Sequence, residues 1–145
     1  MTIDLPDVAA MEAFGARIAS RLSVGDVVAL SGGLGAGKTT LARAIIAASG
    51  YTGEVPSPTF TILETYDSLT PPLVHADFYR LEDIHEVEEL GLDDYREGSA
   101  LLAEWPDRAG GFGHEPQCLQ IALESRGQGR VAIVEAGRDW LGRLP

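Results

Sequence analysis

The spacing of apolar residues near the start of the chain predicts a helix. Met11, Phe14, Ile18 and Leu22 recur every three or four positions, so they share one face of an amphipathic helix that should stop near Gly25. Similar signals predict three more helices, over 39–50, 84–90 and 139–144. The glycines at the ends of the first two mark where those helices should stop.

Short apolar runs predict the strands between these helices. Val27–Leu30 is apolar throughout, which is typical of a strand buried on both faces of a parallel sheet. Two alternating runs, 119–123 and 131–133, flank Gly127-Gln128-Gly129 and indicate an antiparallel hairpin. The other predicted strands are 2–5, 61–66, 73–76 and 100–103, with loops or turns over 51–60, 67–72 and 107–116.

Length and composition agree with an ordinary globular protein. The 145 residues and 45% hydrophobic content suit a single α/β domain over 1–145. The first residues lack a basic stretch followed by an apolar one, and we expect no membrane segment and a cytoplasmic location. The one cysteine, Cys118, lies in an apolar run and is expected to fill the core rather than act as a nucleophile.

The formal charge of −11 limits which partners the chain is expected to bind directly. Nucleic-acid affinity depends largely on Lys and Arg neutralising phosphates, and here acidic residues outnumber basic ones 22 to 11. We therefore expect no direct binding to tRNA. The excess charge is either a solvated acidic surface or a face for a basic partner, and the sequence leaves both open.

A glycine-rich motif follows the predicted strand 27–30. Residues 32–39, GGLGAGKT, match the pattern G-x-x-x-x-G-K-[ST], with a strand before it and a helix after it as the motif requires. Glycines let main-chain N–H groups approach a phosphate, and the helix N-terminus adds more donors. The motif predicts a P-loop NTPase-like sheet with a parallel core, helices on its faces and the antiparallel C-terminal hairpin. Lys38 would reach the β and γ phosphates, and Thr39 would bind magnesium.

Two carboxylates are candidates to hold magnesium beside that loop. A P-loop ATPase needs an acid at the end of a neighbouring strand to hold magnesium, and both Asp77 and Glu104 end apolar runs. Spacing alone does not rank them, and each could instead be solvated or cap the next helix. His75 is expected to be a packing or hydrogen-bonded residue rather than a base, because P-loop chemistry needs no histidine.

Four motifs together give the chain a family resemblance. SGGLGAGKTT, SPTF at 57–60, HADFYRL at 75–81 and EWP at 104–106 occur in an order and at spacings that resemble the TsaE family. The resemblance covers roughly residues 3–135. It implies an ATPase that uses ATP and magnesium and supports threonylcarbamoyl transfer to a tRNA adenosine by the TsaB and TsaD proteins, so that tRNA is met only through that complex.

The resemblance also implies roles for particular residues. It implies Thr39 and Glu104 as metal ligands, with Asp77 orienting water or coupling hydrolysis to the partner. Lys38, Asp77 and Glu104 are thus the expected catalytic residues. The expected nucleotide-binding residues are Val8 near the adenine, Leu34, Gly35, Ala36, Gly37, Lys38, Thr39, Thr40 and Arg130.

A further group is implied for switching or partner contact. Ser57 and Thr59 resemble a switch-like loop, and Tyr79 and Arg80 would form either a salt-bridged corner or a docking surface. Trp105 would face the nucleotide or a partner, or else lie in the core. At Gly33 the chain departs from the family, which commonly has an acid there, and this leaves any role of that carboxylate in doubt.

Two other functions remain open at this stage. A small-molecule kinase would need a lid with clustered arginines, whereas the 11 basic residues here are scattered. A non-catalytic module whose bound nucleotide sets its affinity for a partner would share nearly every residue with an ATPase. Phosphate release with and without the partner complex separates the module from the enzyme.

Overall fold

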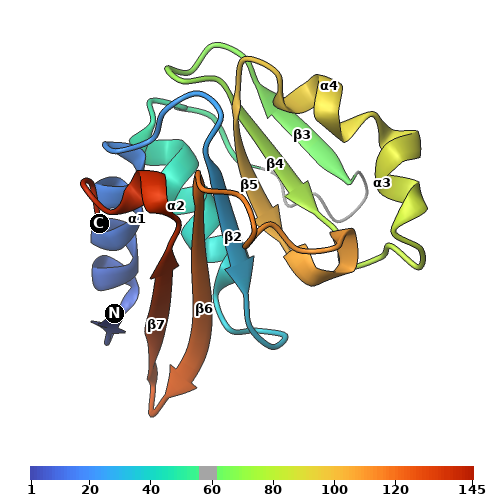
Figure 1. The fold of residues 1–145 in the computed structure, drawn as a ribbon. Helices are drawn as coiled ribbons and strands as arrows, with labels where there is room; N and C mark the ends of the chain where they lie inside the picture. Colours follow the sequence, from blue (N-terminus) through green and yellow to red (C-terminus); the bar gives the residue numbers. More distant parts are fainter. Residues whose placement is uncertain (56–61) are drawn as a thin grey trace.

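The computed structural model describes residues 1–55 and 62–145, and its strands form one mixed sheet (Figure 1). Within these residues the sheet has seven strands in the order β1-β7-β6-β2-β5-β4-β3. The elements, in chain order, are β1 Thr2–Leu5, α1 Val8–Ala19, β2 Val27–Ser31, α2 Lys38–Ala48, β3 Leu63–Tyr66, β4 Leu73–Asp77, α3 His85–Leu90, α4 Leu92–Arg96, β5 Ala100–Glu104, the 3-10 helix η1 Pro106–Ala109, β6 Cys118–Arg126, β7 Gly129–Ala136 and the 3-10 helix η2 Arg138–Trp140.

The centre of the sheet is parallel. β2 lies between β5 and β6 and pairs in parallel with both, and β4 pairs in parallel with β5. The outer strands β3, β7 and β1 pair antiparallel with their neighbours. The expected parallel core and antiparallel C-terminal hairpin are therefore confirmed. The carboxyl ends of β2, β4 and β5 meet at one edge, where α/β proteins commonly place their ligands.

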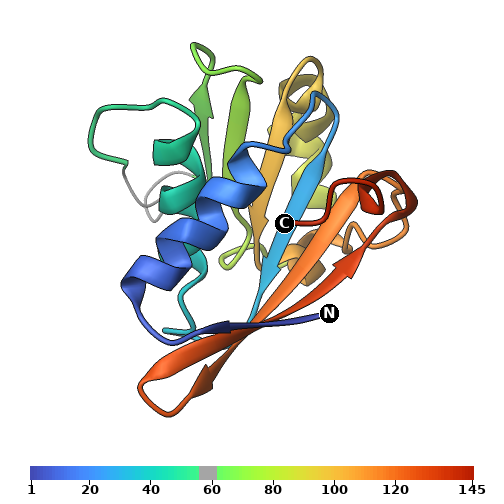
Figure 2. The ribbon, with the colours of Figure 1, turned by 90° about the vertical axis from the view of Figure 1, so that its left-hand side faces the viewer.

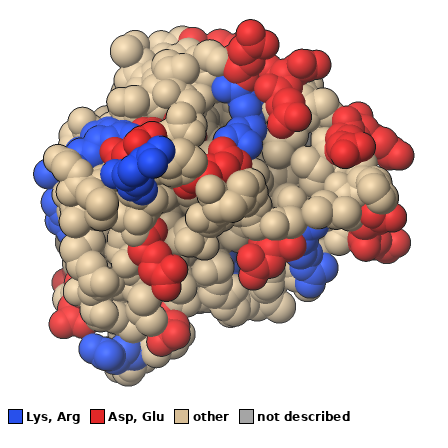
Figure 3. Space-filling model, in the orientation of Figure 1, with Lys and Arg blue, Asp and Glu red and all other residues tan. Residues whose placement is uncertain are grey.

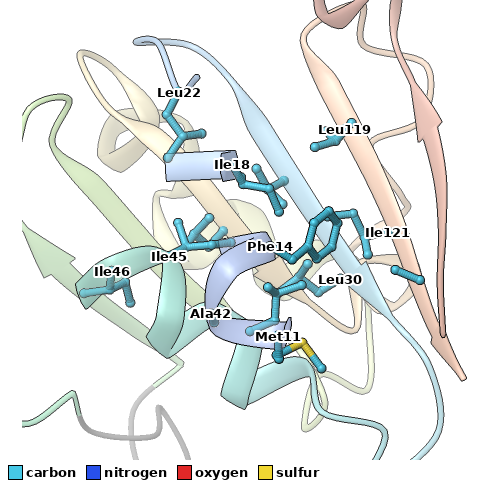
Figure 4. Packing of buried hydrophobic residues seen from close by; sticks show 14 of the residues in the cluster. Met11, Phe14, Ile18, Leu22, Leu30, Ala42, Ile45, Ile46, Leu119 and Ile121 are labelled. Carbon is cyan, nitrogen blue, oxygen red and sulfur yellow. The ribbon is translucent and has the colours of Figure 1, made fainter. Parts of the chain in front are cut away.

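The sheet carries an apolar core on each face. Val28 and Leu30 of β2 pack under α1 and α2 with Phe14, Ile18 and other buried residues of the first core (Figure 4). Val27 and Ala29 point the other way, into a second core that includes Leu92 of α4. This two-sided burial explains why β2 is a continuous apolar run in the sequence. Figure 2 shows α1 and α2 side by side on their face of the sheet.

Several predicted helix boundaries were wrong. The first helix ends at Ala19 rather than near Gly25, because the chain turns at 20–22 while Leu22 still packs into the core. The five-residue helix α4 was not predicted at all. At the C-terminus the predicted helix 139–144 is only the 3-10 turn η2, since Trp140 enters the core there. Both other helices, α2 and α3, lie within two residues of their predicted bounds.

Acidic side chains gather over the part of the surface formed by α3 and α4 (Figure 3).

Cys118 is buried at the start of β6, and burial raises the pKa of its thiol to about 12. The thiol therefore stays protonated near neutral pH, and the prediction that Cys118 fills the core is confirmed. Within residues 1–55 and 62–145, no helix is long and apolar enough to cross a membrane.

A buried ion pair fastens the C-terminal segment to the loop before β2. Arg143 Nη2 donates to Asp26 Oδ1 at 2.6 Å, and Arg143 Nη1 also donates to the Arg21 carbonyl. The guanidinium lies 4.1 Å from the centroid of the Trp140 ring. Asp26 is only 2% exposed, and hydrogen bonding to its carboxylate raises the pKa of Arg143. Arg143 is thus the charged partner of the buried Asp26 carboxylate, which also accepts a hydrogen bond from the Ser23 N–H.

Removing Arg143 should destabilise the fold through this carboxylate. Arg143→Ala leaves Asp26 buried without its charged partner, and because Arg143 is itself 24% exposed we expect a loss of about 2–3 kcal/mol in the free energy of unfolding. Arg126→Ala is the matched control, because its pair with Asp4 is 67% and 75% exposed and should contribute less than about 1 kcal/mol. Urea unfolding of both variants measures the difference. Equal losses would contradict the assignment.

Candidate active site

The glycine-rich loop 32–37 connects the carboxyl end of β2 to the start of α2. Gly32 has φ +137°, and a Cβ there would lie 2.5 Å from the carbonyl oxygen of Leu123, so no other residue fits without movement of β6. Gly37 has φ +102° and directly precedes α2. Because Gly37 has no side chain to cap the helix, the first N–H groups of α2 are left for a ligand. This edge of the molecule is therefore suited to an anion.

Lys38 lies inside the loop. Its side chain is buried, and Nζ donates to the carbonyl oxygens of Gly32 at 2.9 Å and Gly33 at 2.7 Å. The ammonium also lies 4.4 Å from the centroid of the Trp105 ring. Burial lowers the pKa of Lys38, and the negative charges of Glu104 and Asp77 oppose that shift. A bound phosphate would add negative charge and further favour the protonated ammonium.

Thr39 and Glu104 meet beside this lysine. The Thr39 hydroxyl donates to Glu104 Oε1 at 2.7 Å, although the two residues are 65 positions apart in the chain. The parallel pairing of β2 with β5 sets Glu104 opposite Leu30, so the carboxylate lies where the loop begins. Mg²⁺ prefers oxygen ligands, and adjacent oxygens around it lie about 2.9 Å apart when its bonds are 2.0–2.1 Å. This hydroxyl and carboxylate therefore fit a magnesium site.

Asp77 lies next to Glu104 but makes a different contact. It pairs opposite Glu104 in the sheet, and its Oδ1 accepts a hydrogen bond from the N–H of Tyr79 at 3.0 Å. Burial raises the pKa of Asp77, and the Tyr79 N–H opposes the shift. The two carboxylates that the sequence could not rank thus differ in structure. Glu104 accepts a hydrogen bond from the Thr39 hydroxyl, whereas Asp77 accepts one from the backbone N–H of Tyr79, two residues later in the chain.

Two adjacent pockets contain most of the predicted site residues. The first, of about 360 Å³, is lined by Leu34, Gly35, Gly37, Lys38, Thr39, Thr40, Asp77, Tyr79, Glu104, Trp105 and Arg130. The second, of about 340 Å³, shares Gly37, Thr40 and Arg130 with the first and is also lined by Val8. An elongated ligand could occupy both, with its charged end in the first pocket. Ala36 is buried and lines neither of them.

Arg130 braces the loop from β7. Its Nε donates to the Ala36 carbonyl at 3.1 Å, and its Nη2 donates to the Gly35 carbonyl at 3.1 Å. A third hydrogen bond joins Nη1 to the carbonyl of Gly129 at 3.0 Å. Arg130 thus occupies the carbonyl groups of Gly35 and Ala36 in the loop. The family resemblance implied that Arg130 lies near the nucleotide, and in the structure Arg130 lines both pockets.

An aromatic and cationic cluster covers the outer side of the site. Trp105 has φ +53°, which is uncommon for a residue other than glycine, and its ring lies 5.0 Å from that of Tyr79. Arg108 lies 4.9 Å from the Tyr79 ring and donates to the Tyr79 carbonyl at 2.8 Å. Trp105 is half-buried, so it both packs on the second core and lines the pocket. Arg80 is exposed and makes no ion pair with any described residue.

Sequence reasoning did not place Arg108 at this site, and it gave His75 no particular partner. The expectation that His75 is a packing or hydrogen-bonded residue agrees with its contact to Glu104. His75 is fully buried, and its Nε2 lies 2.6 Å from Glu104 Oε2. Two signals were available, because His75 lies two positions before Asp77 on the same strand and begins the HADFYRL motif at 75–81. Ser57 and Thr59 lie outside the described residues.

The comparisons with known proteins agree with this geometry. Residues 5–132 match the family described as threonylcarbamoyl adenosine biosynthesis protein TsaE. The chain belongs to the TsaE family. It is therefore a protein of tRNA threonylcarbamoyladenosine biosynthesis.

Individual relatives support the same assignment. The chain is 41% identical to the TsaE protein of Synechocystis over 113 residues, which are 74% of this chain and 71% of that protein. It is 38% identical to the TsaE protein of Haemophilus influenzae over 82% of this chain and 79% of that protein. The crystal structure of YdiB from Bacillus subtilis superposes with a TM-score of 0.78 at 29% identity, covering 94% of this chain and 85% of that one. The P-loop NTPase-like fold class is thereby confirmed.

Replacing Asp77 should stabilise the protein at neutral pH. Because the pKa of Asp77 is raised in the folded state, its ionised form opposes folding above that pKa, and the penalty disappears as the pH falls below the unfolded value of about 3.9. Asp77→Asn keeps an oxygen for the Tyr79 N–H and loses the charge. We expect a rise in Tm on the order of 1–4 °C at pH 7, fading toward pH 4.

Thermal unfolding across this pH range checks the prediction. Asp67→Asn, in the exposed turn before β4, is the matched control and should leave Tm unchanged. A lower Tm for Asp77→Asn at pH 7 would show that the ionised carboxylate stabilises the fold.

Proposed function

We propose that this chain binds ATP and hydrolyses it with magnesium in support of threonylcarbamoyl transfer to a tRNA adenosine by a TsaB–TsaD complex. The observation that carries the proposal is the contact between the Thr39 hydroxyl and Glu104 Oε1 at 2.7 Å, beside the buried Lys38. A cation, a hydroxyl and a carboxylate at the N-terminus of α2 form the set of groups that P-loop phosphoryl chemistry uses. Membership of the TsaE family supports the pathway.

The loop and Lys38 would hold the phosphates. The first residues of α2 line the pocket and their N–H groups have no side-chain cap, so these groups would bind the phosphates, while Arg130 keeps the carbonyl groups of Gly35 and Ala36 engaged. Lys38 would exchange its two carbonyl contacts, at Gly32 and Gly33, for phosphate oxygens. The exchange replaces neutral acceptors with charged ones, which form stronger hydrogen bonds. Val8, in the adjacent pocket, would contact the nucleoside.

Thr39 and Glu104 would hold magnesium, which neutralises the charge that develops on the phosphates during transfer. Asp77 is close enough to this pair to share the pocket, and burial already raises its pKa. A carboxylate with a raised pKa is a better proton acceptor, so Asp77 would orient or deprotonate the attacking water. Tyr79 and Trp105 form the pocket wall on that side, with Tyr79 exposed for contact with a partner.

The assignment of the metal ligand predicts different behaviour for the two carboxylates. Glu104→Gln keeps the shape but removes the anionic oxygen beside Thr39, so ATP hydrolysis should fall at least about 100-fold and extra Mg²⁺ should not restore it. Asp77→Asn should slow hydrolysis with no change in the Mg²⁺ concentration required. Phosphate release is the measurement, and Glu135→Gln, on the exposed side of β7, is the control. If Asp77→Asn instead needs more Mg²⁺, the two roles are reversed.

The pathway itself is tested by reconstitution. Threonylcarbamoylation of tRNA by TsaB and TsaD should continue for many turnovers only when this chain and ATP are both present. Omitting the chain should limit the reaction to about one round per complex, and adding the chain to tRNA alone should show no binding in a gel-shift assay. Undiminished multiple turnover without the chain would refute the proposed role. Binding of ATP without phosphate release, with or without TsaB–TsaD, would indicate a nucleotide-gated module.

A further inference from the structure

His75 holds the second oxygen of the Glu104 carboxylate. His75 Nε2 lies 2.6 Å from Glu104 Oε2, while Oε1 accepts the Thr39 hydroxyl at 2.7 Å. His75 belongs to β4 and Thr39 to α2, so two different elements form hydrogen bonds with the carboxylate. His75 pairs opposite Leu102 in the parallel register, two positions before Glu104 on the neighbouring strand. The sheet therefore sets this contact, and no movable loop is involved.

The two ring nitrogens of His75 differ in their hydrogen bonding. A carboxylate accepts hydrogen bonds, so the proton on His75 must be at Nε2. The other ring nitrogen, Nδ1, is buried and has no hydrogen-bond partner among the described residues. A buried polar atom without a partner costs about 1–3 kcal/mol, a cost that an apolar residue in the same place would avoid. The interaction that offsets this cost is the hydrogen bond to Glu104.

We propose that His75 is a positioning residue that fixes the rotation of the Glu104 carboxylate, so that Oε1 stays beside Thr39 for a metal ion. This rests on the proposed function, in which Thr39 and Glu104 hold magnesium. Carboxylates that bind metals are commonly held by such an outer hydrogen bond, whose loss lowers metal affinity by about 10- to 100-fold. The effect is on magnesium rather than on the nucleotide, because His75 lines neither pocket.

Four substitutions separate positioning from packing. His75→Gln carries an amide N–H that can reach Glu104, whereas the side chain of His75→Asn is too short to do so. His75→Leu removes the donor altogether and keeps an apolar side chain at this fully buried position, which gives a second donor-free variant should the Asn variant fail to fold. Val74→Ala is the control for lost packing, because Val74 is buried on the opposite face of β4 in the second core. Thermal unfolding reports the stability of all four.

The measurement is the affinity for ADP, by calorimetry, in EDTA and over a series of Mg²⁺ concentrations. The Asn and Leu variants should need about 10- to 100-fold more Mg²⁺ to reach half of the magnesium-dependent gain in affinity. Their ADP affinity in EDTA should equal that of the wild type. The Gln variant and Val74→Ala should require the same Mg²⁺ concentration as the wild type.

Four results would overturn the inference, and only the last of them would also refute the proposed function. An unchanged Mg²⁺ requirement in the Asn and Leu variants, or an equal shift in Val74→Ala, would leave His75 as a packing residue while the proposed function stands. A wild-type chain that binds ADP without any response to Mg²⁺ would remove the metal site on which the inference depends. A wild-type chain that binds neither ADP nor ATP would refute the proposed function itself.

Discussion

The parallel pairing of β2 between β5 and β6 sets the geometry on which the site depends. It aligns Leu30 with Glu104, and the N–H of Trp105 continues the contact by donating to the Leu30 carbonyl at 3.2 Å. The glycine-rich loop therefore leaves the sheet at the level where β5 ends. The next helix, α2, begins directly after the loop and brings Thr39 within hydrogen-bond distance of the Glu104 carboxylate. Pairing of β4 with β5 then adds His75 and Asp77 to the same edge.

In this arrangement the two buried charges of the site, Lys38 and Glu104, are both paired with groups of the protein. Lys38 donates to two carbonyl groups of its own loop, and Glu104 accepts hydrogen bonds at both oxygens. Both residues are almost completely buried, which is costly for charges unless they are paired. Such a concentration of buried charge lowers stability and is found where a protein needs it for binding or chemistry. The groups that would meet a ligand are thus held ready close to where they would act.

The part of this site that sequence could predict is the part encoded by consecutive residues. The loop 32–39, the buried strand before it and the acids at the ends of two apolar runs were all visible, because each is a local pattern. Spacing could not rank Asp77 against Glu104, since both end strands of the same kind. Their difference comes from the sheet register and from the place of Thr39 on α2. The contact between His75 and Glu104 joins residues 29 positions apart and was invisible for the same reason.

Other errors have equally specific causes. Helix α1 was predicted too long because Leu22 keeps the helical spacing while belonging to a turn, and α4 is too short to show a periodic pattern. The cluster of Arg108 with Tyr79 and Trp105 includes the unusual backbone of Trp105, which directly precedes the 3-10 helix η1 that carries Arg108. Family resemblance supplied the pathway, which no local pattern of charge or spacing encodes.

The most direct measurement is a crystal structure of the chain with Mg²⁺ and a non-hydrolysable ATP analogue. The account predicts the metal ion in contact with Thr39 Oγ1 and the Glu104 carboxylate, with the Lys38 ammonium moved from the Gly32 and Gly33 carbonyls to the β and γ phosphates. A structure in which Lys38 keeps both carbonyl contacts and the ion lies on Asp77, away from Thr39, would contradict it.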